Sequence, residues 1–375
     1  MTSTPDETAK TSSVPQTDFE KISRTVSSYF QVDESTIEMG IPTFYLKWPQ
    51  ETKQAFLKLL KDLDETNLMA LLRKVDGRVV LRVLPKPSVK PSNTRVNWAL
   101  FLVTIGTTFL TGYLLSGEFV DRGLMSSPFI GAAAFTVAIM AVLGTHEMGH
   151  KLTANRNKID ATPPYFIPGP PPIGGLLGFG TFGAVIMQKS LPPNKDSLFD
   201  IGSSGPVVGF IVAFVATVIG LLISPVYPMT PAINGTLPSP LIFDLLLMYM
   251  VRLPANYYVL LHPVAFAGWV GMIVTMLNIL PAAMLDGGHI SRSLFGERAR
   301  WVLTFLSLAL LGLSGFWPMA FLVLLMSSFR HPGPLDDVSG LSRGRKLWAV
   351  GIVVIFVLCS FVGLWISQLL GLFGI

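Results

Sequence analysis

Apolar runs long enough to cross a bilayer dominate this sequence from residue 97 onward and constrain its fold more than any other feature. A spanning helix needs about 20 apolar residues, and runs of that kind occupy 97–116, 128–148, 201–223, 258–281 and 348–373. Residues 301–329 are also mostly apolar but are interrupted by GLSGFWP, which predicts a tight helical hairpin. Because 50% of the residues are hydrophobic and only 14% are charged, we expect a polytopic α-helical membrane protein with about seven transmembrane helices.

The residues before the first apolar run have the composition of a soluble domain. Residues 1–17 are polar, rich in Ser and Thr, and lack the apolar stretch of a signal peptide, which predicts a disordered tail. Within 18–89, apolar residues recur at helical spacing between 49 and 74, and the strand-like GRVVLRVL follows, so we expect a small soluble α+β domain. Residues 90–96 fall in a proline-rich linker, after which 97–375 would form the membrane domain.

Basic residues gather on one side of the predicted spans. Lys and Arg are frequent before the first span, after the second and fourth, and before the last, whereas 224–257 holds one Asp and one Arg. The positive-inside rule then places residues 18–89 in the cytoplasm and the C-terminus outside. We expect a multi-pass protein of a cell membrane, specifically a prokaryotic plasma membrane. The net charge of +5 reflects this topology and not nucleic-acid binding, because no basic run is interleaved with aromatic residues.

The second apolar run ends in HEMGH, residues 146–150. His146 and His150 are four residues apart and share one face of a helix, as two imidazoles must to hold one Zn²⁺, and Glu147 lies beside them as a candidate base. Ionisable groups at membrane depth are costly and usually functional, which favours a metal site over a solvated helix end. The chain has one cysteine, Cys359, so a metal must use nitrogen and oxygen ligands.

A catalytic zinc site needs a third protein ligand and one position for water. Asp286, at the end of the fourth span, is our candidate, because the second and fourth spans run in the same direction and end on the same side. The alternative is a helix-terminating Asp-Gly turn. We therefore expect one Zn²⁺ per chain, held by His146, His150 and Asp286, with Glu147 taking a proton from the activated water and passing it to the leaving amine.

These motifs resemble those of the site-2 protease family of intramembrane zinc metalloproteases. The likeness covers roughly residues 128–290 and rests on HEMGH and on the family pattern N-x-x-P-x-x-x-L-D-G, which is matched by Asn278, Pro281, Leu285, Asp286 and Gly287. It implies a three-helix catalytic core and cleavage of transmembrane protein substrates, in regulated intramembrane proteolysis. The N-terminal domain, GTFGAVI at 180–186 and HPGPLDD at 331–337 look similar to the archaeal, cyanobacterial and plastid branch of that family.

Two further features are candidates for substrate binding. Asn278 lies a little over two helical turns deeper than Asp286 and can hydrogen-bond the substrate backbone or oxyanion, or else a neighbouring helix. Residues 165–188 are too rich in Gly and Pro for a spanning helix and too apolar for an ordinary loop, which predicts a membrane-associated hairpin or re-entrant loop. Its strand-like part either pairs with an unwound substrate by β-augmentation or merely caps the site. The candidate contacts there are Gly180, Thr181, Phe182 and Gly183.

Two other classes of protein remain as alternatives. A metal or proton transporter would also place His and Asp within the membrane, but the sequence shows no internal repeat with matched broken helices. A catalytically silent scaffold of the same fold is disfavoured by the intact HEMGH motif and Asp286. The expected partners are a transmembrane protein substrate and the lipid bilayer, without nucleic acid, and the sequence sets no oligomeric state.

Overall fold

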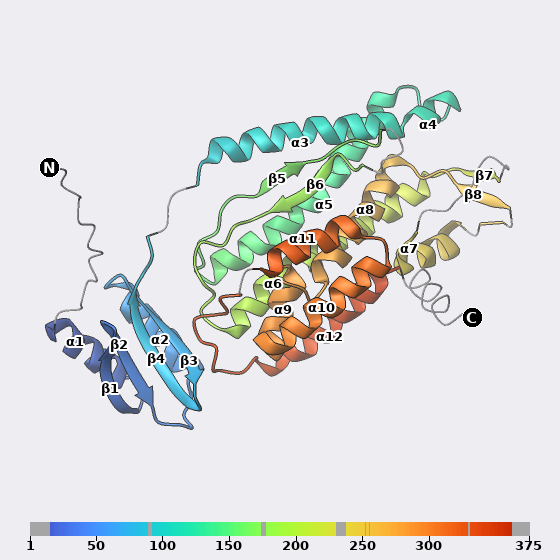
Figure 1. Ribbon diagram of the computed structural model, residues 1–375. Coiled ribbons are helices and arrows are strands. Elements are labelled where there is room, and N and C mark those ends of the chain that lie inside the picture. Colours follow the sequence, from blue (N-terminus) through green and yellow to red (C-terminus); the bar gives the residue numbers. More distant parts are fainter. Residues whose placement is uncertain are drawn as a thin grey trace, which may run out of the picture. The chain divides into compact units, whose positions relative to one another are not determined.

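Figure 1 shows the computed structural model, which describes most of the chain in two compact units. The described residues are 16–88, 92–173, 178–229, 238–251, 253–254, 256–328 and 331–361. Unit 1 comprises the chain up to Val89 together with Leu191–Lys195 and Gly333–Gly340, and unit 2 comprises the rest. The predicted tail at 1–17 lies outside the described residues up to position 15, and its last two residues belong to the first helix.

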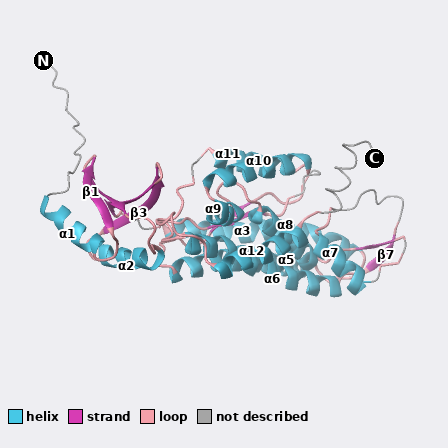
Figure 2. Cartoon of the chain, turned by 90° about the horizontal axis from the view of Figure 1, so that it is seen from below, coloured by secondary structure: helices cyan, strands magenta, loops and turns pink. Residues whose placement is uncertain are grey.

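Unit 1 is a four-stranded antiparallel sheet with two helices. Its elements in chain order are α1 (Gln16–Ser27), β1 (Val32–Glu38), β2 (Ile41–Leu46), α2 (Lys53–Asp64), β3 (Leu68–Val75) and β4 (Arg78–Pro85). The strand order is β1-β2-β4-β3. Phe56, Leu59 and Leu63 recur at helical spacing on α2 and are buried in one core with alternate residues of the strands. Figure 2 shows both helices on the same side of the sheet.

The predicted helical pattern between 49 and 74 is wrong in its second half. The helix ends at Asp64, and residues Leu68–Val75 form β3, paired along its length with β4. Asn67 adopts a left-handed conformation with φ of 55°, which stops the helix. The LMALLRK sequence satisfies helical and strand periodicity equally, so the tertiary pairing decides.

Two short segments from the distant membrane-domain sequence complete unit 1. Leu72 of β3 forms a parallel bridge with Asp336, and Asp336 forms a second parallel bridge with Asn194. The backbone N–H of Leu72 donates to the carbonyl of Leu335 at 2.9 Å. The side chain of Leu335 is buried in the unit 1 core. The sheet is therefore extended beyond β3 by residues that lie far away in sequence.

Unit 2 is predominantly helical. Its elements are α3 (Thr94–Leu115), α4 (Gly117–Asp121), α5 (Pro128–Arg156), β5 (Tyr165–Pro168), β6 (Thr181–Val185), α6 (Lys195–Leu222), β7 (Val226–Pro228), α7 (Leu241–Leu246), the π-helix η1 (Leu247–Val251), β8 (Tyr257–Val259), α8 (Pro263–Ile279), α9 (Asp286–Phe295), α10 (Glu297–Leu313), α11 (Trp317–Ser327) and α12 (Arg343–Cys359). The start of α3 at Thr94 shortens the predicted 90–96 linker, because Asn93 caps the helix by accepting from the N–H of Arg95.

Three helical segments among the described residues are long and apolar enough to cross a membrane: 94–121, 128–156 and 195–222. The predicted span at 258–281 forms α8, which has 17 residues. The predicted hairpin in 301–329 is present as α10 and α11, which are separated by residues 314–316 and have 17 and 11 residues. The predicted last span at 348–373 begins within α12, which has 17 residues, and its residues 362–373 lie outside the described part of the chain. The seven transmembrane helices therefore stay a prediction, and three helical segments among the described residues are long and apolar enough to cross a membrane.

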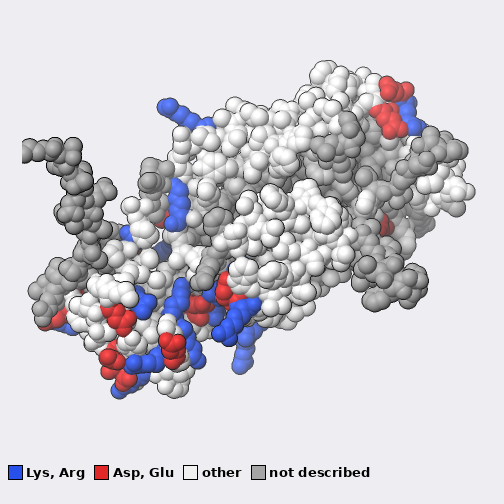
Figure 3. All heavy atoms as spheres, viewed as in Figure 1, with Lys and Arg blue, Asp and Glu red and all other residues white. Residues whose placement is uncertain are grey.

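One large apolar core of unit 2 joins its long helices. It draws buried residues from α5, α6 and α8, including Phe135, Ala213 and Met272. In the view of Figure 3, charged side chains of unit 2 gather toward its two ends, and the surface between them is free of them. That distribution is what a hydrocarbon environment around the middle of the helices requires.

Candidate metal centre

Three side chains from two distant segments converge on one point of unit 2. The Nε2 atoms of His146 and His150 are 3.1 Å apart, and each lies 3.2 Å from Oδ2 of Asp286. Both histidines are buried, and the Asp286 side chain retains a little exposure. The structure thus brings together the three residues that the sequence nominates as ligands.

The donor set and its spacing fit a zinc ion. Zinc bound to histidine nitrogen and carboxylate oxygen at about 2.0–2.1 Å in tetrahedral geometry holds its ligand atoms about 3.3 Å apart. The three observed separations of 3.1 and 3.2 Å match that triangle. Glu147 also offers a carboxylate oxygen, and its nearest atom is 4.0 Å from Nε2 of His146. The site can therefore hold the metal with three ligands and keep a carboxylate beside it.

Helix α5 places the two histidines on one face toward its C-terminal end. The helix begins at Pro128 after Ser127, whose side chain accepts from the N–H of Phe129. It continues for 29 residues, so HEMGH occupies regular helical backbone. The i, i+4 spacing then stacks the two imidazoles one turn apart.

Helix α6 lies against the histidines at two glycines. A Cβ atom at Gly205 would collide with the His150 ring, and one at Gly209 would lie 2.9 Å from Nδ1 of His146. The carbonyl of Ile201, also on α6, is 2.8 Å from Nδ1 of His150. Because a carbonyl can only accept, this nitrogen carries the proton, which leaves the Nε2 lone pair free for a metal. The GxxxG spacing of Gly205 and Gly209 was a readable signal of close helix approach that the sequence reasoning missed.

Asp286 is the first residue of α9 and follows a tight turn after α8. A Cβ at Gly287 would collide with the carbonyl of Ile279, and one at Gly288 would lie 2.6 Å from the carbonyl of Ala282. Glycine is required at both positions because the first turn of α9 folds back on the end of α8. The alternative that Asp286 and Gly287 form a helix-terminating turn is therefore wrong, because Asp286 is the first residue of a helix.

The β5–β6 hairpin approaches the candidate base. Within the predicted 165–188 region, β5 and β6 pair in antiparallel register, and residues 174–177 lie outside the described part of the chain. The backbone N–H of Ile186, just after β6, interacts with the carboxyl group of Glu147. The end of β6 therefore lies beside the site.

The four candidate substrate contacts on this hairpin divide into two pairs. The carbonyl of Gly180 accepts from Oγ1 of Thr107 on α3 at 2.6 Å, and Thr181 is buried and donates to the carbonyl of Ile167. Phe182 is 73% exposed, and a Cβ at Gly183 would meet nothing within 4 Å. The first pair anchors the hairpin, and the second pair is accessible.

Asn278 lies next to the ligand triangle. Its Nδ2 atom is 3.5 Å from Nε2 of His146. The residue is on α8, seven positions before Leu285, which is the N-cap residue of α9. This position is compatible with contact to substrate and with packing against α5, so both predicted roles stay open.

Other histidines lie outside the triangle. His262 caps α8, with Nδ1 accepting from the N–H of Val264 at 3.2 Å. Nδ1 of His289 and Nε2 of His331 are 2.7 Å apart and form a hydrogen-bonded pair. In the sequence, residues 331–337 supported only the family resemblance, and the pairing of His331 with His289 could not be predicted because it joins residues 42 positions apart.

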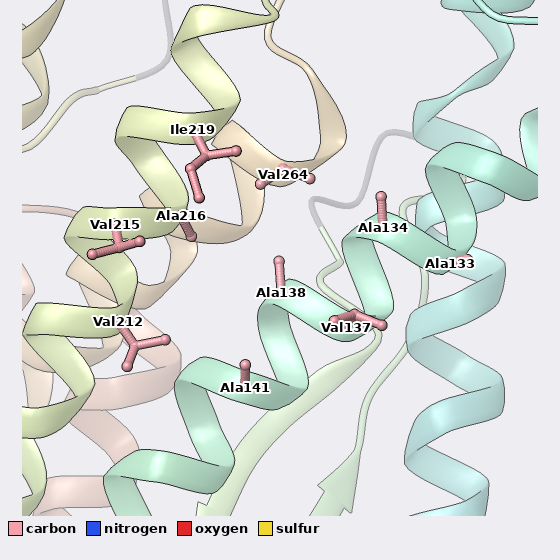
Figure 4. A pocket seen from close by; sticks show the side chains of 10 residues that line it. All are labelled: Ala133, Ala134, Val137, Ala138, Ala141, Val212, Val215, Ala216, Ile219 and Val264. Atoms are coloured by element: carbon pink, nitrogen blue, oxygen red, sulfur yellow. The ribbon is translucent and has the colours of Figure 1, made fainter.

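An apolar groove of about 470 Å³ lies between α5 and α6 (Figure 4). Alanine and valine side chains of α5 face valine, alanine and isoleucine side chains of α6, with Val264 at one end. None of the described residues that line the groove is ionisable, so they offer no group for catalysis. A surface of this kind suits hydrocarbon chains of the bilayer.

Comparison with known proteins identifies the segment that carries the site. Residues 134–311 match the model of Peptidase family M50. The chain is 31% identical over 328 residues to the probable zinc metalloprotease EGY1, chloroplastic, of Arabidopsis thaliana, covering 77% of this chain and 57% of the relative. It is 29% identical to the probable zinc metalloprotease EGY2, chloroplastic, of the same plant, covering 78% and 54%. The EGY1 protein of Oryza sativa subsp. japonica is 31% identical, covering 69% and 45%.

The chain spans about half the length of the curated relatives it matches. No solved structure matches it. The matched segment contains His146, Glu147, His150 and Asp286, so the converging residues belong to the part of the chain that the family model covers.

Proposed function

Since residues 134–311 form a peptidase family M50 domain, that of the site-2 proteases, and the chain is homologous to the EGY zinc metalloproteases, we propose that it is an intramembrane zinc metalloprotease. Its reaction is hydrolysis of peptide bonds within or near transmembrane helices of substrate proteins. One Zn²⁺ per chain is bound by His146, His150 and Asp286.

One observation supports this proposal above all others: three ligand atoms from α5 and α9 form a triangle of the size that zinc requires. A scaffold without activity would not need to keep a buried carboxylate beside that triangle. Glu147 is such a carboxylate, and its burial is costly without a purpose.

Glu147 acts as the general base and acid. It neighbours the ligand triangle without being needed to complete it, so it can accept a proton from water and deliver it to the leaving amine. The backbone N–H of Ile186 lies beside its carboxyl group. When bound, the zinc ion would polarise the scissile carbonyl and activate the water.

The hairpin presents an extended substrate to this site. Among the described residues, β6 pairs only with β5, so its second edge is available for an added strand. Phe182 and Gly183 contact the substrate there, while Gly180 and Thr181 hold the hairpin in place. Asn278 hydrogen-bonds the substrate backbone or the oxyanion.

We place the protein in a membrane, with the Lys- and Arg-rich segments that flank its helices on the cytoplasmic side. Residues 18–89 are cytoplasmic, and the membrane is the plasma membrane of a prokaryote. Ion pairs at one end of unit 2 support a location of the first turns of α6 and α12 on the same side of the membrane. Arg345 of α12 pairs with Asp196 and Asp200 of α6 at 3.0 and 2.6 Å. The plant relatives are named as chloroplastic, and in a plastid the stroma would take the place of the cytoplasm.

Cleavage of a model transmembrane substrate by the purified protein in detergent tests the proposal. We expect the wild type to cleave, a chelator to stop cleavage, and added Zn²⁺ to restore it. Glu147→Gln should keep one zinc per chain and lose cleavage, because the amide cannot take a proton. Cleavage that survives both the chelator and Glu147→Gln would rule out this mechanism.

A further inference from the structure

The turn that leads to Asp286 contains an alanine in an unfavourable backbone conformation. Ala283 has a φ of 45°, in the left-handed region that side-chain-bearing residues avoid. It lies between the end of α8 and the start of α9 and is completely buried. Such a conformation persists only when surrounding groups hold it.

Helix α10 supplies two groups that hold this peptide unit. The N–H of Ala283 donates to Oγ1 of Thr304 at 3.0 Å, and the carbonyl of Ala283 accepts from Nη1 of Arg300 at 3.1 Å. Both polar groups of one residue are thus bound by side chains one helical turn apart. The Thr304 hydroxyl in turn donates to the carbonyl of Arg300 at 2.8 Å, which fixes its orientation.

Arg300 is an unusual residue for this environment. Its side chain is 1% exposed, although a buried guanidinium is costly unless it is fully paired. Glu297 satisfies two of its nitrogens, at 2.9 Å from Nε and 2.6 Å from Nη2. The remaining terminal nitrogen is the one that binds the Ala283 carbonyl. The ion pair with Glu297 therefore fixes the guanidinium of Arg300, so that its Nη1 atom donates to the carbonyl of Ala283.

The Ala283 peptide unit is in direct contact with the first turn of α9. A Cβ on Gly288 would collide with the Ala283 carbonyl, so this carbonyl lies directly against the helix that begins with Asp286. A rotation of the Ala283 peptide would displace that first turn. A carboxylate ligand must be held within a few tenths of an ångström to serve its metal.

We propose that Arg300 and Thr304 are positioning residues, which hold Ala283 in its left-handed conformation and thereby fix the Asp286 carboxylate beside His146 and His150. The inference rests on the proposed zinc site and adds residues to its support. Neither side chain is part of the ligand triangle, and each acts through the backbone of the turn.

The rate of zinc release to an excess of a colour-forming chelator measures this role without any proteolysis assay. Thr304→Val keeps the shape of the side chain and removes the acceptor, so we expect zinc to leave about tenfold faster. Thr304→Ser keeps the hydroxyl and should stay within about twofold of the wild type.

Arginine variants provide a second arm with a matched control. Arg300→Lys keeps the charge but cannot bind Glu297 and the Ala283 carbonyl in the same geometry, so it should also release zinc about tenfold faster. Arg298 is exposed on the same helix turn. Arg298→Lys should release zinc at the wild-type rate.

A rescue variant tests whether the two hydrogen bonds act by maintaining the backbone conformation of Ala283. Glycine adopts positive φ without penalty, so Ala283→Gly should reduce the need for the two hydrogen bonds. We expect the Thr304→Val/Ala283→Gly double variant to release zinc more slowly than Thr304→Val alone, because glycine keeps the left-handed conformation of the turn without the lost hydrogen bond. The thermal midpoint of each variant confirms that it is folded.

The outcomes distinguish this inference from the function that it rests on. If the wild type binds no zinc after removal of adventitious ions, the metal site fails and the inference fails with it. If the wild type binds zinc but folded Thr304→Val and Arg300→Lys release it at the wild-type rate, only the positioning role is overturned. Absence of rescue by Ala283→Gly would also contradict it.

Discussion

At the scale of single residues, the sequence identified ionisable residues within apolar runs. It missed residues whose role depends on burial or on contacts with distant segments. His146 and Glu147 were readable because ionisable groups at the end of an apolar run are costly. Arg300 was read only as a topological charge, because burial of an arginine cannot be seen in a sequence. Gly205 and Gly209 were missed because a glycine in an apolar helix has many possible reasons.

Gly205 provides a prediction at this scale. In Gly205→Ala the added methyl group would collide with the His150 ring, and the cheapest adjustment is to move the imidazole away from the metal. We expect zinc affinity to fall by at least about tenfold, measured by competition with a chelator of known affinity.

Gly106→Ala is the matched control for that measurement. Gly106 is also within a long helix, and a Cβ there would meet nothing within 4 Å. Alanine is favoured over glycine in helices by about 1 kcal/mol, so this variant should bind zinc normally and be at least as stable as the wild type. Normal zinc affinity in Gly205→Ala would mean that the histidine is not held by α6.

At the scale of elements, α3 holds the hairpin although it precedes the segment that the family model covers. The Nδ2 atom of Asn97 donates to the carbonyls of Pro163 and Pro164 at 3.1 and 2.9 Å. Gly180 is clamped at the other end, because a Cβ there would lie 2.6 Å from the carbonyl of Thr107. The Gly and Pro content of the sequence predicted a membrane-associated hairpin or re-entrant loop. It could not show which helix this segment would bind, since these contacts are non-local.

Removal of the Thr107 hydroxyl tests the anchor. Thr107→Val loses the hydrogen bond to the Gly180 carbonyl, and loss of one such bond costs roughly 1 kcal/mol. We expect the amides of residues 181–186 to exchange about fivefold faster with deuterium, as measured by mass spectrometry of that peptide.

Thr104→Val is the control, because that hydroxyl donates to the carbonyl of Leu100 within its own helix. It should leave exchange at 181–186 unchanged. Equal exchange in both variants and the wild type would show that Thr107 does not anchor the hairpin.

At the scale of the whole molecule, the boundary of unit 1 is the least predictable feature. Composition separates a soluble N-terminal segment from the apolar remainder, and the described strands and helices of 16–88 fit that reading. Nothing in the sequence shows that 191–195 and 333–340 complete the same unit. Strand pairing between segments more than 100 residues apart leaves no local pattern.

Leu335 tests whether these segments stabilise unit 1. Its side chain is in the unit 1 core and its carbonyl accepts from the N–H of Leu72. Leu335→Ala should destabilise the unit by about 2 kcal/mol or more, seen as faster deuterium exchange along Leu68–Val75. Leu347→Ala, at a position that is 75% exposed, is the control and should leave exchange there unchanged. Identical exchange in Leu335→Ala would show that unit 1 folds without the later segment.

The orientation in the membrane is the prediction on which the mechanism as a whole depends. The basic ends of the helices predict that Ser92 is cytoplasmic and Ser239 is outside. In a Cys359→Ser background, a cysteine at position 239 should react with an impermeant thiol reagent on intact bacterial cells. A cysteine at position 92 should react only after lysis. The reverse pattern would place the end of α5, with its histidines, on the outer side, and water and substrate would then have to reach the zinc from there.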